Sequence, residues 1–209
     1  IPAGSHEHVE VYGTAAHEFE GVVVGDIDLV VPSALLQRVA ALPEHPYHRV
    51  GYAPDADGLP QGVAAEGILR SIVSSHNDDN DWVIDSAGTY GGHSGDLPDR
   101  RMRVHATRRG YNLTHRARRF TPSDFSDFDL IIPMDSANER NLRSMAPTLD
   151  DEAKIVTMME FVRMATRYDH VPDPYYEGAE GFELVLDLLE DGCRNLYDDI
   201  TAMRNDTSR

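Results

Sequence analysis

Side chains able to act as nucleophiles, acid–base groups or metal ligands are sparse in this sequence of 209 residues. The single cysteine, Cys193, falls on the apolar face of a helical pattern, where a thiol packs in the core more often than it reacts. One cysteine excludes an intramolecular disulfide and a cysteine metal cluster. The ten histidines show no paired spacing typical of zinc sites. Two aspartates, Asp55 and Asp57, follow a possible strand, although such pairs are also common in turns.

The hydrophobic pattern divides the chain near residue 48. Residues 1–48 predict an N-terminal extension of two short strands and a helix, closed by Pro43 and Pro46. Residues 49–209 alternate strands with helices, which implies βαβ units and a parallel sheet covered by helices. Because ligands bind at the carboxyl ends of such strands, we expect chemistry just after residues 54, 86, 134 and 156.

The expected elements of the larger part follow from this pattern. The strands are expected over residues 49–54, 82–86, 128–134 and 153–156. The helices are expected over residues 62–75, 98–110, 135–145 and 178–200, the last with one apolar face.

Five groups of residues occur in an order and spacing that match a known family. They are Ala65-Glu-Gly-Ile-Leu-Arg70, Asp85-Ser-Ala-Gly-Thr89 with Leu97-Pro-Asp99, Thr114-His-Arg-Ala-Arg118, Phe128-Asp-Leu-Ile-Ile-Pro-Met-Asp135 with Asn138, and Val171-Pro-Asp-Pro-Tyr-Tyr176. Together they resemble the low-molecular-weight protein tyrosine phosphatases over roughly three quarters of the chain. The resemblance implies an α/β fold with a four-stranded parallel sheet flanked by helices, and the hydrolysis of phosphotyrosine.

The same resemblance implies a phosphate loop, with a cysteine, five residues, an arginine and then a serine or threonine. In that chemistry the thiolate attacks phosphorus, while the arginine and backbone N–H groups hold the phosphate oxygens. Counting back from Glu66 puts Asp55 at the cysteine position, Gln61 at the arginine position and Gly62 at the hydroxyl position. The loop therefore lacks the nucleophile, the cationic clamp and the hydroxyl.

Electrostatics predicts that this loop binds phosphate weakly or not at all. Asp55 and Asp57 have no nearby cation in sequence. Two like charges a few ångströms apart cost on the order of several kcal/mol at an effective dielectric constant near 20. A phosphate dianion would add to this repulsion unless a metal intervened.

The segment that would supply the general acid is intact. The resemblance implies that Asp173, between two prolines, is the acid, and that one of Tyr175 and Tyr176 walls the aromatic substrate slot. Tyr90 is a candidate for the other wall, although the family's aromatic falls slightly later. Ser86 resembles the residue that hydrogen-bonds the phosphate loop, or it is an ordinary strand-end hydroxyl.

We therefore predict a pseudophosphatase that acts by binding, with no cofactor and no metal. One alternative is a magnesium-assisted phosphomonoesterase with Asp55 as the nucleophile. It rests on Asp55-Ala-Asp57-Gly58 and Asp26-Ile-Asp28, which resemble the aspartyl-nucleophile motif of haloacid-dehalogenase-type phosphatases. Another alternative is an altered or designed version of an active phosphatase.

The charge balance limits the partners. The chain carries 36 acidic and 19 basic residues, a net charge of −17, which argues against nucleic acids and anionic membranes. Lys154 is the only lysine, and two interpretations of this scarcity stay open: an ordinary acidic soluble protein, or one adapted to high salt. The apolar stretches are too short to span a bilayer and no signal peptide is evident, so we expect a cytoplasmic protein.

Eight arginines lie within residues 100–119, the only basic stretch of the chain. They form either a solvated face paired with carboxylates elsewhere, or a docking site for an acidic protein or a phosphoprotein.

Overall fold

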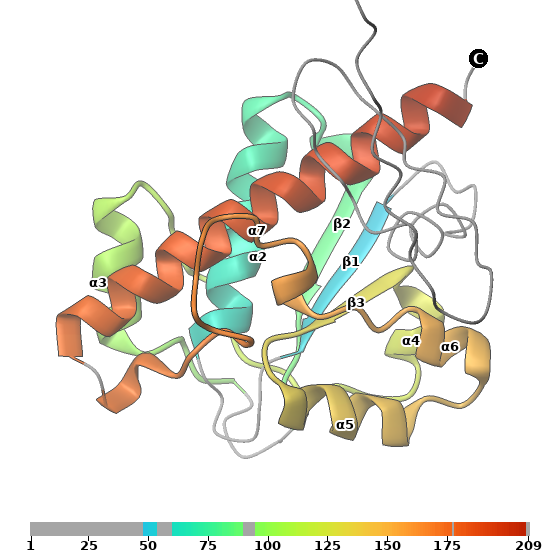
Figure 1. The fold of residues 1–209 in the computed structure, drawn as a ribbon, viewed down its shortest axis with the longest axis horizontal. Helices are drawn as coiled ribbons and strands as arrows, with labels where there is room; N and C mark the ends of the chain where they lie inside the picture. Colours follow the sequence, from blue (N-terminus) through green and yellow to red (C-terminus); the bar gives the residue numbers. More distant parts are fainter. Residues whose placement is uncertain (1–47, 54–59, 90–94, 177, 208–209) are drawn as a thin grey trace, which may run out of the picture. The chain divides into compact units, whose positions relative to one another are not determined.

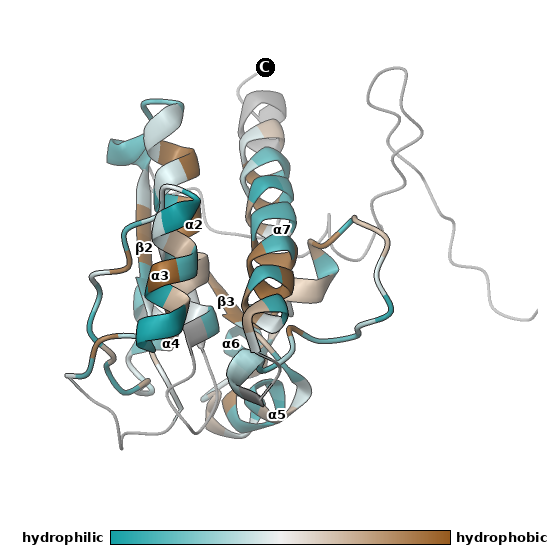
Figure 2. Ribbon diagram, turned by 90° about the vertical axis from the view of Figure 1, so that its left-hand side faces the viewer, coloured by the Kyte–Doolittle hydropathy of each residue, from teal (hydrophilic) through white to brown (hydrophobic). Residues whose placement is uncertain are grey.

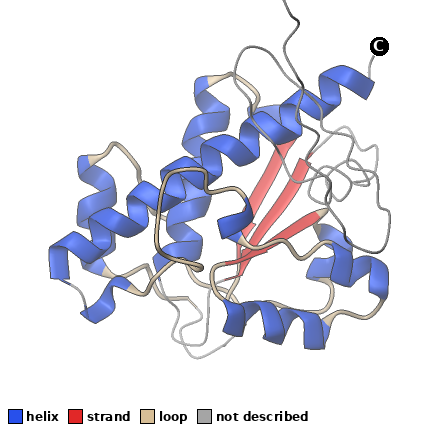
Figure 3. Cartoon of the chain, in the orientation of Figure 1, coloured by secondary structure: helices blue, strands red, loops and turns tan. Residues whose placement is uncertain are grey.

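The computed structural model describes residues 48–53, 60–89, 95–176 and 178–207. Its sheet contains three parallel strands in the order β2-β1-β3 (Figures 1 and 3). The strands are β1 (His48–Ala53), β2 (Trp82–Ser86) and β3 (Leu130–Pro133). Val50 of β1 lies opposite Ile84 on one side and Leu130 on the other. The predicted α/β class, with a parallel sheet flanked by helices, is confirmed.

The strand expected over residues 153–156 is reduced to an isolated bridge. Ile155 pairs in parallel with Ile131, whose N–H donates to the Lys154 carbonyl at 2.9 Å and whose carbonyl accepts from Val156 N–H at 3.1 Å. Helix α6 (Leu149–Ala153) ends just before this bridge, and the 3₁₀ turn η2 (Met158–Glu160) follows soon after it. The extended stretch is too short for a full strand, so within the described residues the expectation of four full strands was wrong.

Two long helices form the main layer beside the sheet. Helix α2 (Pro60–Ser75) packs on β1 and β2, and α7 (Gly178–Thr207) packs on α2, crossing it in Figure 1. The apolar face predicted for the last helix is buried. Its members are Phe182, Val185, Leu186, Leu189, Cys193, Leu196 and Ile200. Burial of this face accounts for the helix, because an isolated helix gains little stability from propensity alone.

Short helices connect these layers. They are η1 (Asp79–Asp81), α3 (Arg100–Arg108), α4 (Asp124–Asp127), α5 (Ser136–Met145) and η3 (Pro174–Tyr176). Asp99 caps α3 by accepting from Arg101 N–H, and Asp135 caps α5 by accepting from the N–H groups of Ala137 and Asn138. The caps fix where each helix begins, slightly later than the pattern predicted.

The predicted extension over residues 1–48 lies outside the described residues, except for His48 at the start of β1. Within the described part of the chain, no helix combines the length and apolar character needed to cross a membrane.

Gly67 allows the segment after α3 to lie close against α2. A Cβ atom at this position would come within 2.5 Å of Cδ2 of Leu113, a buried residue. This approach positions the residues that follow Leu113, including His115, beside α2. The contact thus links the packing of α2 to the polar groups described below.

We expect Gly67→Ala to lower the free energy of unfolding by about 1 kcal/mol. Overpacking costs about 1–3 kcal/mol, while replacing a helical glycine returns up to about 1 kcal/mol. Urea denaturation of Gly67→Ala, Leu113→Ala and the double variant measures the coupling. In the Leu113→Ala background the same change should cost less or stabilise the protein. Equal costs in both backgrounds would disprove the steric account.

Candidate functional site

The candidate site lies where β1 and β3 end side by side. Ala53 of β1 pairs with Pro133 of β3, and the strand order departs from chain order at this point. Such a topological switch point is where open α/β sheets bind ligands. The Val171 N–H donates to the Met134 carbonyl at 2.9 Å, which brings the loop containing Asp173 to the end of β3.

Gln61 joins this loop to the start of α2. Its side chain is 3% exposed, and Nε2 donates to the Pro172 carbonyl at 3.2 Å across 111 residues of sequence. A buried amide needs such a partner, because an unmade hydrogen bond there costs roughly 1–3 kcal/mol. The residue at the predicted arginine position therefore uses one of its hydrogen-bond donors within the protein.

The loop containing Asp173 is held by local contacts. Asp173 is half-buried, and its Oδ1 accepts from the Tyr175 N–H at 2.8 Å. Arg101 of α3 donates to the Tyr175 carbonyl at 3.2 Å, and its guanidinium lies over the Tyr175 ring at 4.7 Å and the Phe182 ring at 5.0 Å. Arg101 thus connects α3, η3 and α7 beside the candidate acid.

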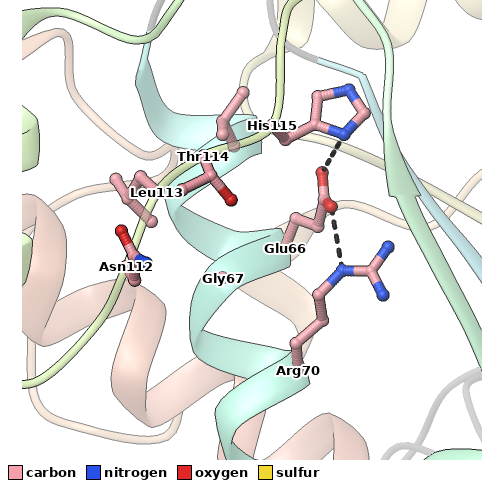
Figure 4. Close-up of a pocket in the computed structure, with 8 residues that line it drawn as sticks. Glu66, Gly67, Arg70, Asn112, Leu113, Thr114 and His115 are labelled. Carbon is pink, nitrogen blue, oxygen red and sulfur yellow. Dashed lines mark hydrogen bonds and ion pairs between the residues drawn. The ribbon is translucent and has the colours of Figure 1, made fainter.

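A buried carboxylate, Glu66, forms the centre of a polar network behind the site. Glu66 is 3% exposed and accepts from Ser86 Oγ at 2.6 Å and from Arg70 Nε at 2.9 Å. Arg70 also donates to the Ile84 carbonyl of β2. Figure 4 shows the side chains of Arg70 and His115 both directed at Glu66. The network therefore ties α2 to the end of β2.

His115 connects this carboxylate to a second one. Its Nδ1 lies 3.4 Å from Glu66 Oε2 and 3.5 Å from Asp85 Oδ1. Arg118 forms one ion pair with the other oxygen of Asp85 at 2.7 Å and a second ion pair with Asp124 at 2.9 Å. The hydrogen bond to Glu66, more than the opposing burial, raises the pKa of His115, and the charges of Glu66 and Asp85 add to this effect.

The pKa of Glu66 shifts in the opposite direction, below its ordinary value. Burial by itself raises the pKa of this carboxyl, but hydrogen bonds from His115, Ser86 and Arg70 together outweigh it and leave the pKa below its ordinary value. Both shifts favour the ion pair, with a carboxylate on Glu66 and a proton on each nitrogen of His115.

Glu66, Asp85 and His115 offer ligand atoms within 4.8 Å of one another, a spacing that could suit a metal ion. Arg70 and Arg118 already bind the two carboxylates, and Ser86 donates to Glu66. A divalent cation would have to displace or oppose these positive charges. The cluster therefore fits an internal ion-pair network better than a metal centre.

A cavity of about 260 Å³ opens beside this network (Figure 4). Its walls come from α2 and from the segment after α3, including Glu66, Arg70, Asn112, Thr114 and His115. It lies on the side of α2 where Gly67 faces Leu113, and not at the contact between Gln61 and Pro172.

The structure brings together some of the predicted site residues. Gln61 contacts the loop that carries Asp173 and Tyr175, whereas the Ser86 hydroxyl is used by Glu66. Asp55 and Tyr90 lie outside the described residues, as does the side chain of Tyr176 at the end of η3.

The roles of His115, Arg118 and Arg101 were not predicted from the sequence. His115 and Arg118 belong to one of the segments that carry the family resemblance, so a signal for them was present. Arg101 was seen only as one member of the basic stretch, because its contact with Tyr175 spans 74 residues.

Comparisons with known proteins agree on one family. The family model described as low molecular weight phosphotyrosine protein phosphatase matches residues 61–207. A Synechocystis protein named as a member of this class is 44% identical over 133 residues, covering 64% of this chain and 84% of its own. The human low molecular weight phosphotyrosine protein phosphatase is 32% identical over 135 residues, covering 62% and 82%.

A solved structure gives the same result. The crystal structure of a protein tyrosine phosphatase from Entamoeba histolytica superimposes with a TM-score of 0.69 at 33% identity. The match covers 74% of this chain and 97% of that one, so nearly the whole relative corresponds to part of this chain.

We expect the contribution of His115 to stability to be complete below about pH 6.5, the pKa of histidine in an unfolded chain, and to be lost as pH rises through the higher folded value. The free energy of unfolding of His115→Gln should therefore approach that of the unmodified protein above this range. An NMR titration of His115 gives the pKa directly. A value at or below 6.5 would contradict the ion-pair assignment.

Proposed function

Because this chain belongs to the low-molecular-weight protein tyrosine phosphatase family, we propose that it keeps the family fold but is a pseudophosphatase, which acts by binding. The observation that carries this proposal is the contact between the buried Gln61 amide and the Pro172 carbonyl. It lies at the position where the family chemistry requires an arginine that is free to hold phosphate.

The family reaction begins with a thiolate, and this sequence has an aspartate, Asp55, at that position. The one thiol of the chain cannot substitute for it. Cys193 is 0% exposed on α7, and its Sγ donates to the Ala65 carbonyl of α2 at 3.6 Å. A nucleophile must reach phosphorus, whereas this thiol is enclosed between two helices, so a cysteinyl-phosphate has no residue on which to form.

Gln61 cannot perform the work of the arginine. A guanidinium presents five N–H donors and a full positive charge in a fork that suits phosphate. The Gln61 amide is neutral, and Nε2 already donates to Pro172. Charge-assisted hydrogen bonds are roughly twice as strong as neutral ones, so even a released amide would hold a phosphate dianion poorly.

The sequence around this position makes anion capture worse. Asp55 and Asp57 both precede Gln61, and no basic residue lies between Arg49 and Arg70. Their negative charges oppose a phosphate dianion instead of neutralising it. The family match begins at residue 61, directly after this segment, which also supports the loss of the phosphate loop.

The candidate acid, in contrast, keeps an ordered position. Asp173 accepts a hydrogen bond from Tyr175, while Arg101 holds the Tyr175 carbonyl. A general acid contributes only when a bond to phosphorus is being broken. An intact acid loop without a nucleophile therefore supports retention of a surface for binding, not turnover.

We expect no hydrolysis of para-nitrophenyl phosphate above the uncatalysed rate, with or without magnesium, because the covalent step has no nucleophile. Colorimetric assays of the full chain, Asp55→Asn and Asp173→Asn measure this. Magnesium-dependent turnover that Asp55→Asn abolishes would favour the alternative, a phosphomonoesterase with Asp55 as nucleophile. Metal-free turnover that Asp173→Asn abolishes would contradict the proposal.

We also expect isothermal titration to detect no micromolar binding of phosphate or vanadate without metal. Restoring the cation and removing one carboxylate, in Asp55→Asn with Gln61→Arg, should tighten phosphate binding by about tenfold or more, as expected for new charged hydrogen bonds. Asp55→Asn alone is the matched control, and thermal melts verify folding. Micromolar affinity in the unmodified chain would disprove the electrostatic argument.

A further inference from the structure

The structure separates the eight arginines of residues 100–119 by what their side chains bind. Most are used within the domain. Arg101, Arg109 and Arg118 pair with carboxylates, while Arg103 and Arg116 donate to the carbonyls of Pro98 and Gly95. The side chains of Arg100, Arg108 and Arg119 are exposed and have no hydrogen bond or ion pair to any described residue.

Two of these unpaired arginines share one face of α3. Arg100, Val104 and Arg108 are spaced four residues apart, which places them in a row along a helix, and we call them the α3 row. All three are exposed, Val104 to 41%. The opposite face, with Met102, His105 and Ala106, is buried. Figure 2 shows both polar and apolar residues on α3, at the side of the domain that faces the viewer.

The helix itself supplies no compensating charge. Its nine residues include four arginines and no carboxylate. The nearby acidic side chains of α7 are already engaged, since Glu183, Asp187 and Glu190 all bind Arg109. Among the described residues the α3 row therefore presents two arginines without an ion-pair partner and an apolar residue between them, in a chain whose net charge is −17.

We propose that the α3 row docks an acidic segment of a partner protein. Arg100 and Arg108 bind separate carboxylates, and Val104 packs on an apolar side chain between them. The two arginines are eight residues apart, which is about 12 Å along a helix. A phosphate group is held by donors that converge on one point, whereas this spacing suits several carboxylates along a chain.

The acidity of the whole protein does not cancel this attraction. At physiological ionic strength the Debye length is about 8 Å, so exposed carboxylates farther away are largely screened. The two unpaired guanidinium groups act at contact distance. Remote negative charge slows the approach of an acidic partner more than it weakens the docked contacts.

The row starts next to Arg101, which holds Tyr175 in the loop of the candidate acid. A partner on α3 would therefore lie beside the candidate site. The inference gives the proposed binding function a partner chemistry, but it rests on α3 alone and would hold equally for an active enzyme. Peptide binding and phosphate turnover are separate readouts, so the two proposals can fail independently.

The test is fluorescence anisotropy with the full chain and a labelled peptide in which glutamates surround a central leucine pair. We expect saturable binding that weakens as potassium chloride is raised. Arg100→Glu with Arg108→Glu should raise Kd at least tenfold, whereas Arg119→Glu, an exposed unpaired arginine outside the row, should change it by less than about twofold.

Three outcomes would overturn the proposal. The first is no saturable binding of the acidic peptide to the full chain. The second is an equal loss of affinity in Arg119→Glu, which would indicate nonspecific charge attraction. The third is tighter binding of a peptide with one phosphotyrosine and no other acidic residue. Thermal melts show whether the variants stay folded, which we expect because these side chains are exposed and bind no other residue that the structure describes.

Discussion

A buried carboxylate, Glu66, is the constraint on which the rest of this domain depends. It is 3% exposed on α2, and an isolated charge at such a place would be strongly unfavourable. Arg70, Ser86 and His115 supply the compensating contacts from three different places in the chain. Removing one partner from such a group is costly, so α2, the end of β2 and the segment after α3 are held together by charge as well as by apolar packing.

The proposed loss of the family's chemistry is compatible with this constraint. The groups that fix α2 lie behind the site, at Glu66 and beyond, whereas the groups that would attack and hold phosphate come before it. With α2 fixed, Gln61 Nε2 donates to the Pro172 carbonyl at 3.2 Å. This hydrogen bond joins the start of α2 to the loop that contains Asp173. The contacts of Glu66 do not include Gln61, the residue at the position where the family resemblance implies an arginine.

Much of the fold could be predicted from sequence, since it follows from local pattern. The bounds of β2 and the buried face of α7 match, because a short apolar run and a long helical repeat are strong signals. The length of the fourth strand was overestimated. The hydrophobic pattern does not show that α6 ends at Ala153 and η2 begins at Met158, which leaves little extended chain around Ile155. The candidate site could be predicted from the sequence only in part. Gln61 could be placed by counting from Glu66, but its bond to Pro172 spans 111 residues and leaves no local signal.

The arginine-rich stretch shows the same limit. Its charge was evident, but which arginines are paired depends on tertiary contacts, such as that of Arg109 with Glu183 of α7, 74 residues away. Only tertiary structure distinguishes the paired arginines from the α3 row.

The central claim, that no covalent step is possible, can be tested by intact-mass spectrometry of the full chain after rapid quenching from para-nitrophenyl phosphate, with and without magnesium. The account predicts the unmodified mass at every time point. A mass increase of one phosphoryl group, mapped to Asp55 or to Cys193, would contradict it.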